Sequence, residues 1–288
     1  MSRYTFHVSR LPLHAPSFTF YASRFTFYVS RSTFYAPPLH RFHLPPAQCQ
    51  ADFLTLGDRE AHHALRVLRL RPGDPVTVLD GAGNEFTCAV ADTVRDTVRL
   101  GVKSRRSVPK PPYQLTLLQA LPKGKLINSI IEKATELGAA RVIPLITERV
   151  VTHLDEDKAG AKREHWQQAA IEAIKQCGSA WLPQVEAAIT PAQFIARSEP
   201  FDLAFVASLQ PGSQHPRELF AAYRAQHGHA PERVCVWVGP EGDFTPEEIA
   251  ITRGAGAIPI TLGPLVLRAD TAAVYCLSVL SYELQAPG

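Results

Sequence analysis

A strand end and a helix start meet in the stretch VWVGPEGDFTPEEI, residues 236–249. The apolar run leads directly into a Gly-Pro-Glu-Gly turn at 239–242, whose glycines let the backbone approach a ligand closely. Thr245 then suits the N-cap, Pro246 the first helical position, and Glu248 completes a capping box. The stretch predicts a strand–loop–helix unit. From its residue types alone, a ligand-binding loop and a well-capped connection without a ligand fit equally well.

Alternating strands and helices surround this unit from residue 114 onward. Apolar runs that alternate with amphipathic segments are typical of a largely parallel sheet covered by helices on both faces. The predicted strands are 114–121, 141–146, 202–207, 233–239 and 257–262, and the predicted helices are 124–137, 161–177, 215–227, 246–254 and 269–284. Ligands of such sheets bind where strands end and helices begin, so we expect the chemistry in these loops.

The segment before this region predicts a small, mostly β barrel. Short β-prone runs, such as RFHL at 41–44 and EFTCAVAD at 85–92, are separated by tight Gly- and Pro-containing turns. One helix is predicted over 58–70, with Asp58 as its N-cap. The Pro-rich run SVPKPPY at 107–113 predicts a linker to the alternating region.

Residues 1–36 form an imperfect seven-residue repeat rich in Ser, Thr and aromatic residues. The repeat lacks the apolar seam of a coiled coil and the aliphatic bulk of a core, so it predicts disorder. Its acid-free, Arg- and Ser-rich composition is similar to that of an organelle transit peptide. We favour a translated tandem repeat ahead of the true start.

Composition excludes several classes of protein. Apolar residues make up 45% and charged residues 20%, as in ordinary globular proteins, and no run approaches the ~18 to 20 apolar residues that span a bilayer. Five scattered cysteines without a C-x-x-C pair predict no disulfide framework and no zinc site, and we interpret all five as small buried apolar residues in a reducing compartment. Basic residues outnumber acidic ones by three over 41–110, which is compatible with nucleic-acid contact.

Two further loops carry charged residues at places suited to chemistry. Arg268 and Asp270 lie between an apolar run and a long hydrophobic helix. They form either a local ion pair and helix cap or, in the functional interpretation, a guanidinium beside a polar or anionic substrate. Lys123 and Arg149 follow the carboxyl ends of the strands predicted at 114–121 and 141–146, which makes them candidates for substrate contact.

The combination of motifs resembles one family. GPEGDF at 239–244 and LGPLVLRADTA at 262–272 are similar to the GPEGGF and LGxRILRxETA signatures of RsmE-type RNA methyltransferases of the SPOUT superfamily. Three more landmarks come in that family's order: HHALRVLRLRPGD at 62–74, the run from 117 to 149, and IKQCG at 174–178. The resemblance covers about residue 41 to the end.

The resemblance implies a domain organisation. A small PUA-like β-barrel domain that binds RNA is expected at 41–108. The repetitive extension at 1–40, which the resemblance does not reach, is expected to be disordered. A SPOUT-type α/β methyltransferase domain with a C-terminal trefoil knot is expected at 113–288. General topology rules make knots essentially absent, so this knot rests on the resemblance alone. The family also implies a homodimer.

The same resemblance implies a function and its residues. We expect a cytoplasmic, metal-free enzyme that methylates N3 of a specific uridine in 16S ribosomal RNA, free or in the assembling small subunit, with S-adenosylmethionine as donor. The cofactor would lie among residues 207–209, 239–242 and 262–268 and contact Leu209, Gly239, Pro240, Gly242, Leu262, Gly263, Leu267 and Thr271. Arg268 would stabilise the uracil anion, and Asp270 or Glu241 would accept the proton. The residues expected to contact RNA are Arg41, Arg66, Arg69, Arg71, Lys123 and Arg149.

Three departures from the family pattern leave alternatives open. Asp243 stands where glycine is common, Asp270 where glutamate is usual, and Leu265 where arginine is frequent. A SPOUT methyltransferase acting on another RNA and a non-catalytic RNA-binding assembly factor are therefore the competing interpretations. A nicotinamide-dependent dehydrogenase fits poorly, because no G-x-G-x-x-G follows an early strand.

Overall fold

The structure is a computed structural model that describes residues 40–124, 126–149, 156–208 and 212–285. These residues belong to one compact unit. The predicted extension at 1–40 lies, except for His40, outside the described residues. Within the described ranges no helix is both long and apolar enough to cross a membrane.

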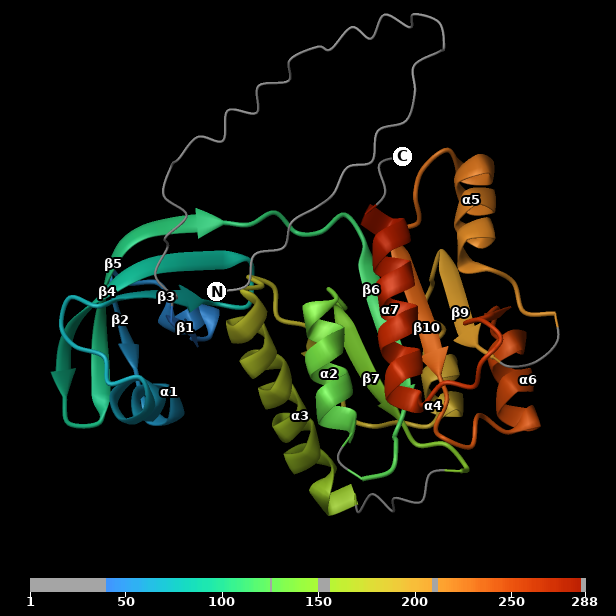
Figure 1. Cartoon of the computed structure of the whole chain (residues 1–288), viewed down its shortest axis with the longest axis horizontal. Helices are drawn as coiled ribbons and strands as arrows, with labels where there is room; N and C mark the ends of the chain where they lie inside the picture. The colour runs from blue at the N-terminus through green and yellow to red at the C-terminus, as the bar shows by residue number, and fades with distance from the viewer. Residues whose placement is uncertain (1–39, 125, 150–155, 209–211, 286–288) are drawn as a thin grey trace, which may run out of the picture. The chain divides into compact units, whose positions relative to one another are not determined.

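A five-stranded sheet in the order β1-β3-β4-β5-β2 forms the first part of this unit (Figure 1). Its strands are β1 His40–His43, β2 Phe53–Leu56, β3 Pro75–Leu79, β4 Asn84–Val94 and β5 Thr97–Ser107. Neighbouring strands are antiparallel except β1 and β3, which run parallel. The strands expected here are confirmed. Over the described residues the pairing runs from β1 to β2 without joining these two edges, so closure into a barrel stays a prediction.

The helix of this part differs from the prediction at both ends. Helix α1 spans Asp58–His62 and continues as a π-helical turn, His63–Val67, so the helical segment is shorter than 58–70. The prediction that Asp58 is the N-cap is wrong, because Gly57 occupies the cap with an extended backbone and no side-chain cap bond forms. Asp58 is the first helical residue and has a φ of +43°. A short 3₁₀ turn, Pro46–Gln48, also precedes β2.

A six-stranded sheet of parallel strands in the order β11-β9-β10-β6-β7-β8 forms the second part. Its strands are β6 Gln114–Ala120, β7 Arg141–Leu145, β8 Gln184–Val185, β9 Leu203–Ala207, β10 Arg233–Val238 and β11 Ile258–Ile260. The helices are α2 Leu126–Glu136, α3 Glu156–Cys177, α4 Pro191–Ala196, α5 Pro216–His227, α6 Pro246–Gly254 and α7 Ala269–Gln285. All five predicted strands and all five predicted helices are confirmed, with ends that shift by a few residues.

The helices cover both faces of this sheet, because alternate residues of each buried strand point to opposite sides. On one face Leu115 and Leu117 pack into a core with residues of α2, α3, α5 and α7. On the other face Leu118 and Trp237 pack with Phe194 of α4 and residues near α6. The sheet therefore has the two-sided cover that its uninterrupted apolar strands predict.

Four of the five cysteines confirm their interpretation as small buried residues. Cys49, Cys88, Cys235 and Cys276 are buried and free. The same interpretation is wrong for Cys177, which is free but exposed. It is the last residue of α3, and the helix ends there because Gly178 takes a φ of +80° and returns its N–H to the Ile174 carbonyl.

The strand order places the loops after β6 and β10 side by side. From β6 the chain adds β7 and β8 toward one edge, then crosses to β9 and returns to insert β10 between β9 and β6. Such a reversal opens a crevice at the carboxyl ends of the strands. Strand β10 ends in register with β6, Val238 opposite Gln119, so the Gly-Pro-Glu-Gly turn starts beside the loop that holds Lys123.

Candidate active site

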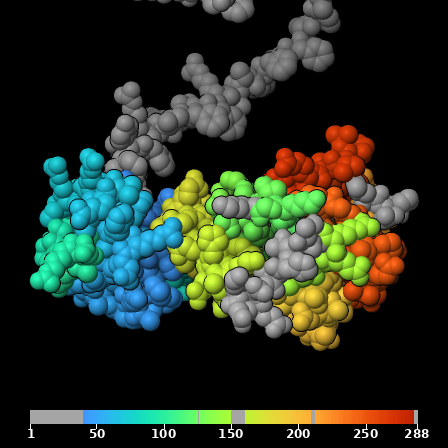
Figure 2. Space-filling model, turned by 90° about the horizontal axis from the view of Figure 1, so that it is seen from below, coloured from blue at the N-terminus to red at the C-terminus, as the bar shows by residue number. Residues whose placement is uncertain are grey.

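A hollow of about 550 Å³, measured out to open solvent, lies at the carboxyl ends of β9 and β10 and the start of α7. Three segments line it: Ala207 and Ser208 at the end of β9; Val238, Gly239, Pro240, Glu241 and Asp243 after β10; and Leu262, Leu265, Val266, Leu267, Ala269 and Ala272 around the start of α7. Figure 2 looks at the molecule from below Figure 1, toward the end at which β6 and β10 finish.

A capping box fixes the point at which the β10–α6 loop enters α6. The predicted capping box is confirmed: the Glu248 N–H donates to Thr245 Oγ1 over 3.2 Å, and the Thr245 N–H donates to Glu248 Oε2 over 2.9 Å. The other Glu248 oxygen, Oε1, accepts the N–H of Glu148 over 3.0 Å. The Glu248 residue is only 5% exposed, so these bonds supply the hydrogen bonds that water would otherwise make. One buried carboxylate thus joins the loop after β7 to the loop after β10.

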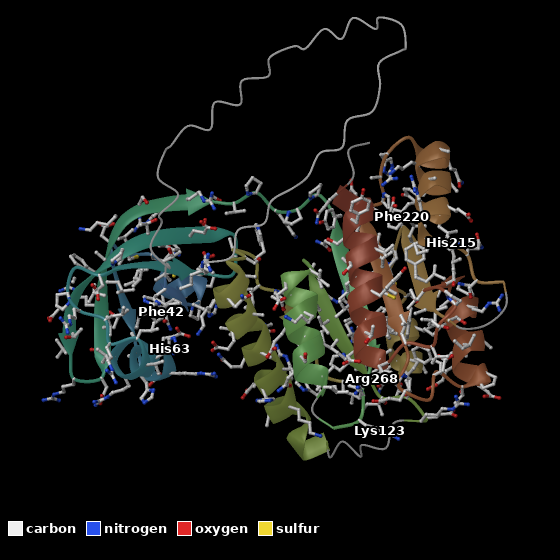
Figure 3. The ribbon with its side chains drawn as sticks, viewed as in Figure 1. Phe42, His63, Lys123, His215, Phe220 and Arg268 are labelled. Atoms are coloured by element: carbon white, nitrogen blue, oxygen red, sulfur yellow. The ribbon has the colours of Figure 1, made fainter. Side chains whose placement is uncertain are left out.

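Two more contacts tie the Gly-Pro-Glu-Gly turn to its neighbours. Glu241 Oε1 accepts the backbone N–H of Lys123 over 3.1 Å, and the Arg149 guanidinium donates to the Gly242 carbonyl. Lys123 and Arg149 therefore lie against this turn, at the strand ends where the sequence placed them. Figure 3 shows Lys123 at the end of the molecule where Arg268 also lies.

The backbone of Asp243 explains why a glycine suits its position. Asp243 has a φ of +60°, in the left-handed region that glycine enters without strain and that aspartate tolerates better than most residues. Its Oδ1 accepts the following N–H, that of Phe244, over 2.8 Å. A Cβ added to Gly239 would lie 3.0 Å from the same Oδ1, so only glycine fits at 239 without displacing this turn. The departure at 243 is thus accommodated within the loop.

The loop before α7 ends in a loosely paired arginine. Gly263 has a φ of +100° and donates its N–H to Thr261 Oγ1 over 3.1 Å. The Arg268 side chain is 77% exposed, and its Nε lies 3.9 Å from Asp270 Oδ1. Such an exposed, long contact contributes little free energy, so the guanidinium can exchange it for a substrate contact. Asp270 Oδ1 also accepts the N–H of the next residue, Thr271, over 2.9 Å, within the first turn of α7. The helix-cap alternative stays a prediction, because an N-cap side chain accepts an N–H two or three positions further along the chain.

Two family models match the chain. The RNA methyltransferase domain matches residues 109–281, which is more than half of the sequence, and the RNA methyltransferase PUA domain matches residues 56–103. The chain belongs to the RNA methyltransferase family. Its fold is accordingly a PUA-like β domain followed by a SPOUT-type α/β domain, while the trefoil knot and the boundaries 41–108 and 113–288 stay predictions.

Relatives of this RNA methyltransferase match along most of their length. Ribosomal RNA small subunit methyltransferase E of Synechocystis sp. is 34% identical over 249 residues, covering 85% of this chain and 78% of that protein. The Bacillus subtilis protein of the same name is 31% identical over 237 residues, covering 82% of this chain and 92% of its own length. The resemblance to the RsmE family is confirmed.

Solved structures share the fold. A methyltransferase from Legionella pneumophila, in complex with the bound cofactor SAM, superimposes with a TM-score of 0.76 at 31% identity, covering 85% of this chain and 97% of that one. Ribosomal RNA small subunit methyltransferase E from Neisseria gonorrhoeae, bound to S-adenosyl methionine, superimposes with a TM-score of 0.73 at 25% identity. The match covers 84% of this chain and 96% of that one.

The residues predicted to hold the cofactor divide into three groups. Gly239, Pro240, Leu262 and Leu267 line the hollow. Gly242 and Gly263 in its loops and Thr271 in the first turn of α7 do not line it, and Leu209 lies outside the described residues. Leu265 and Val266, which belong to the expected 262–268 segment, line the hollow as well, whereas sequence reasoning did not select Val238, Asp243, Ala269 and Ala272. Most of these are apolar, and only their position beside the two motifs could have indicated them.

The predicted catalytic residues also differ in whether they line the hollow. Glu241 lines the hollow, whereas Arg268 and Asp270 lie just outside its lining. Burial raises the pKa of the Cys235 and Cys276 thiols to about 12, so these core cysteines remain protonated and are poor nucleophiles. The described residues contain no group of three or more His, Cys, Asp or Glu side chains that could hold a metal ion.

The arginines of the β domain differ in their surroundings. Arg66, Arg69 and Arg71 are exposed. Arg41 donates instead to the carbonyls of Lys175 and Gln176, 3.3 and 3.1 Å away, at the carboxyl end of α3. A cation is favourable at a helix carboxyl end, so these contacts account for Arg41 without RNA. Its predicted phosphate contact stays a prediction, in competition with this structural role.

Proposed function

We propose that this RNA methyltransferase transfers the methyl group of S-adenosylmethionine to N3 of a uridine in 16S ribosomal RNA. One observation carries the proposal: the Gly-Pro-Glu-Gly turn and the 262–272 loop, the two segments with family signatures, form the walls of one hollow. The relatives named for small-subunit ribosomal RNA methylation support the substrate, and the SAM-bound structures support the donor. Ribosomal RNA of the bacterial relatives is made and modified in the cytoplasm, which is the location we propose.

The hollow suits the adenosine of this donor. Pro240, Leu262 and Leu267 offer apolar surface for the adenine, and Gly239 lets the backbone come close to the ligand. When bound, S-adenosylmethionine supplies an electrophilic methyl group on a positively charged sulfur. Cleavage of that bond needs no acid, so the chain mainly has to orient donor and acceptor.

The acceptor requires more from the side chains, because N3 of uracil carries a proton that must be lost. The resulting negative charge spreads onto the two flanking carbonyl oxygens. Arg268, exposed at the rim of the hollow, places a guanidinium where it can stabilise that charge. Glu241 lines the hollow and Asp270 does not, so the geometry favours Glu241 as the proton acceptor and Asp270 as the residue that orients Arg268.

Exposed cations would position the RNA. Arg66, Arg69 and Arg71 belong to the PUA-like domain and can bind phosphates without reading sequence. Lys123 is exposed beside the Gly-Pro-Glu-Gly turn, and its ammonium suits a phosphate next to the target nucleotide. Arg149 already donates to the Gly242 carbonyl, so we assign it first to the loop and second to RNA.

The proposed function predicts donor binding and a defined product. Titration calorimetry of the full chain with S-adenosylmethionine is expected to give about one site per chain. Incubation with unmodified small-subunit RNA or 30S particles and labelled donor is expected to yield 3-methyluridine, identified by nuclease digestion and mass spectrometry. Donor binding followed by methylation at a ribose or at another base would contradict the uridine-N3 assignment. No donor binding by the folded chain would contradict the enzymatic assignment altogether.

The exposed side of α7 supports a homodimer. Thr271, Tyr275, Ser278 and Tyr282 recur at helical spacing on that side, and none of them is charged. Tyr282 is 75% exposed. A helix face turned to water normally carries charges, whereas exposed aromatic residues are enriched at protein interfaces. We infer that this stripe meets its copy in a second chain.

A charge placed in this stripe is expected to weaken the dimer. Tyr282→Glu should raise the dimer dissociation constant about tenfold or more, because a buried interface tyrosine is replaced by a carboxylate facing its copy. Analytical ultracentrifugation over a concentration series measures the change. Ala222→Glu, on the exposed side of α5, is the matched control and should leave association unaltered. A wild-type chain that sediments as a monomer throughout the series would contradict the dimer.

A further inference from the structure

The ionisable side chains that line the hollow are all acidic. Among the described residues that line it, the ionisable side chains are Glu241 and Asp243, both carboxylates, with no Lys, Arg or His. The cations of the neighbouring loops do not line it: Arg149 donates to the Gly242 carbonyl, Arg268 is largely exposed beside Asp270, and Lys123 is exposed. An anionic lining favours a ligand that carries positive charge.

Asp243 adds its charge without being required for the turn. Its left-handed backbone could be adopted by glycine or asparagine, and the bond from the Phe244 N–H needs only an acceptor oxygen at Oδ1. The same bond anchors the side chain, so the carboxylate is held in the wall of the hollow. The negative charge is therefore the one property of Asp243 that the loop geometry does not explain.

The donor and the product of the proposed reaction differ in one charge. S-adenosylmethionine carries a sulfonium. When the methyl group leaves, the electron pair of the broken C–S bond stays on sulfur, and S-adenosylhomocysteine is a neutral thioether with the same adenosine, amine and carboxylate. A fixed anion near the sulfur therefore attracts the donor more strongly than the product.

We propose that Asp243 is a specificity-determining residue that makes the hollow prefer S-adenosylmethionine over S-adenosylhomocysteine and so favours release of the discharged product. The inference rests on the proposed function, because it concerns the same hollow. The attraction between a half-buried carboxylate and a sulfonium bound in the same hollow, partly screened by water, is expected to change donor affinity about threefold to tenfold.

The test measures both ligands on the full chain by titration calorimetry. Asp243→Asn keeps the left-handed preference and the acceptor oxygen but removes the charge. Asp243→Gly removes the charge and installs the residue that the backbone suits best. Glu247→Gln is the matched control, since it removes one exposed carboxylate from the first turn of α6, outside the lining.

Both Asp243 variants are expected to bind S-adenosylmethionine about threefold to tenfold more weakly, with S-adenosylhomocysteine changed by less than about twofold. The control should match the wild type for both ligands, and the Asp243 effect should shrink as salt rises. Equal losses for both ligands, or a loss in the glycine variant alone, would overturn the inference and leave the proposed function intact. A folded wild-type chain that binds neither ligand would overturn the proposed function itself.

Discussion

Replacing Arg268 with alanine is expected to lower kcat for RNA methylation by about 10²- to 10³-fold and to leave the Kd for S-adenosylmethionine within about twofold. The arginine lies outside the lining of the hollow, so its loss removes no contact surface for the cofactor. Its exposed guanidinium is loosely paired with Asp270 and can turn to the uracil oxygens. Single-turnover kinetics with labelled donor, together with calorimetry, separates the two quantities.

The pH profile distinguishes this role from a structural one. If Arg268 stabilises the N3 anion, the deficit of Arg268→Ala should shrink as pH rises toward the pKa of N3–H, because the anion then forms without help. Arg268→Lys keeps the charge but not the planar fork and should fall between alanine and wild type. A mutant whose donor affinity drops as far as its rate would show that Arg268 belongs to the cofactor site instead.

Periodicity was sufficient to predict the larger elements of the α/β domain. Long apolar strands and amphipathic helices repeat their hydrophobic pattern over many residues. The capping box at Thr245 and Glu248 marks the start of α6 at the observed residue. The two-residue strand β8 has too few residues for a pattern. Helix α4 is also short, although its capping box at Thr190 and Gln193 could have indicated it.

The site was predictable only in part, for a physical reason. The motif loops could be placed at strand ends, because parallel strands finish at one edge of the sheet. The hydrogen bonds between these loops join residues up to 118 positions apart, as between Lys123 and Glu241. Patterns in the local sequence cannot predict such contacts. Arg41 illustrates the same limit, since its charge is used by the carboxyl end of a helix more than 130 residues away.

Glu248→Ala is expected to lower the free energy of unfolding by about 3 kcal/mol, the largest stability effect we expect near the site. The carboxylate is 5% exposed and accepts two backbone N–H groups, those of Thr245 and Glu148. Alanine leaves both donors without their acceptor, and each charge-assisted bond contributes about 1.5 to 3 kcal/mol. Water can replace part of the loss at Glu148, which is exposed, so the total lies toward the lower end.

Urea denaturation followed by far-ultraviolet circular dichroism measures this loss, and Glu247→Ala is its control. Glu247 belongs to the same helical turn but is exposed, so its replacement should change the unfolding free energy by less than about 0.5 kcal/mol. Because Glu248 also holds the loop that lines the hollow, the alanine variant should bind S-adenosylmethionine more weakly, and saturating donor should restore part of its stability. If Glu248→Ala unfolded at the same urea concentration as Glu247→Ala, the buried carboxylate would not be what holds these two loops together.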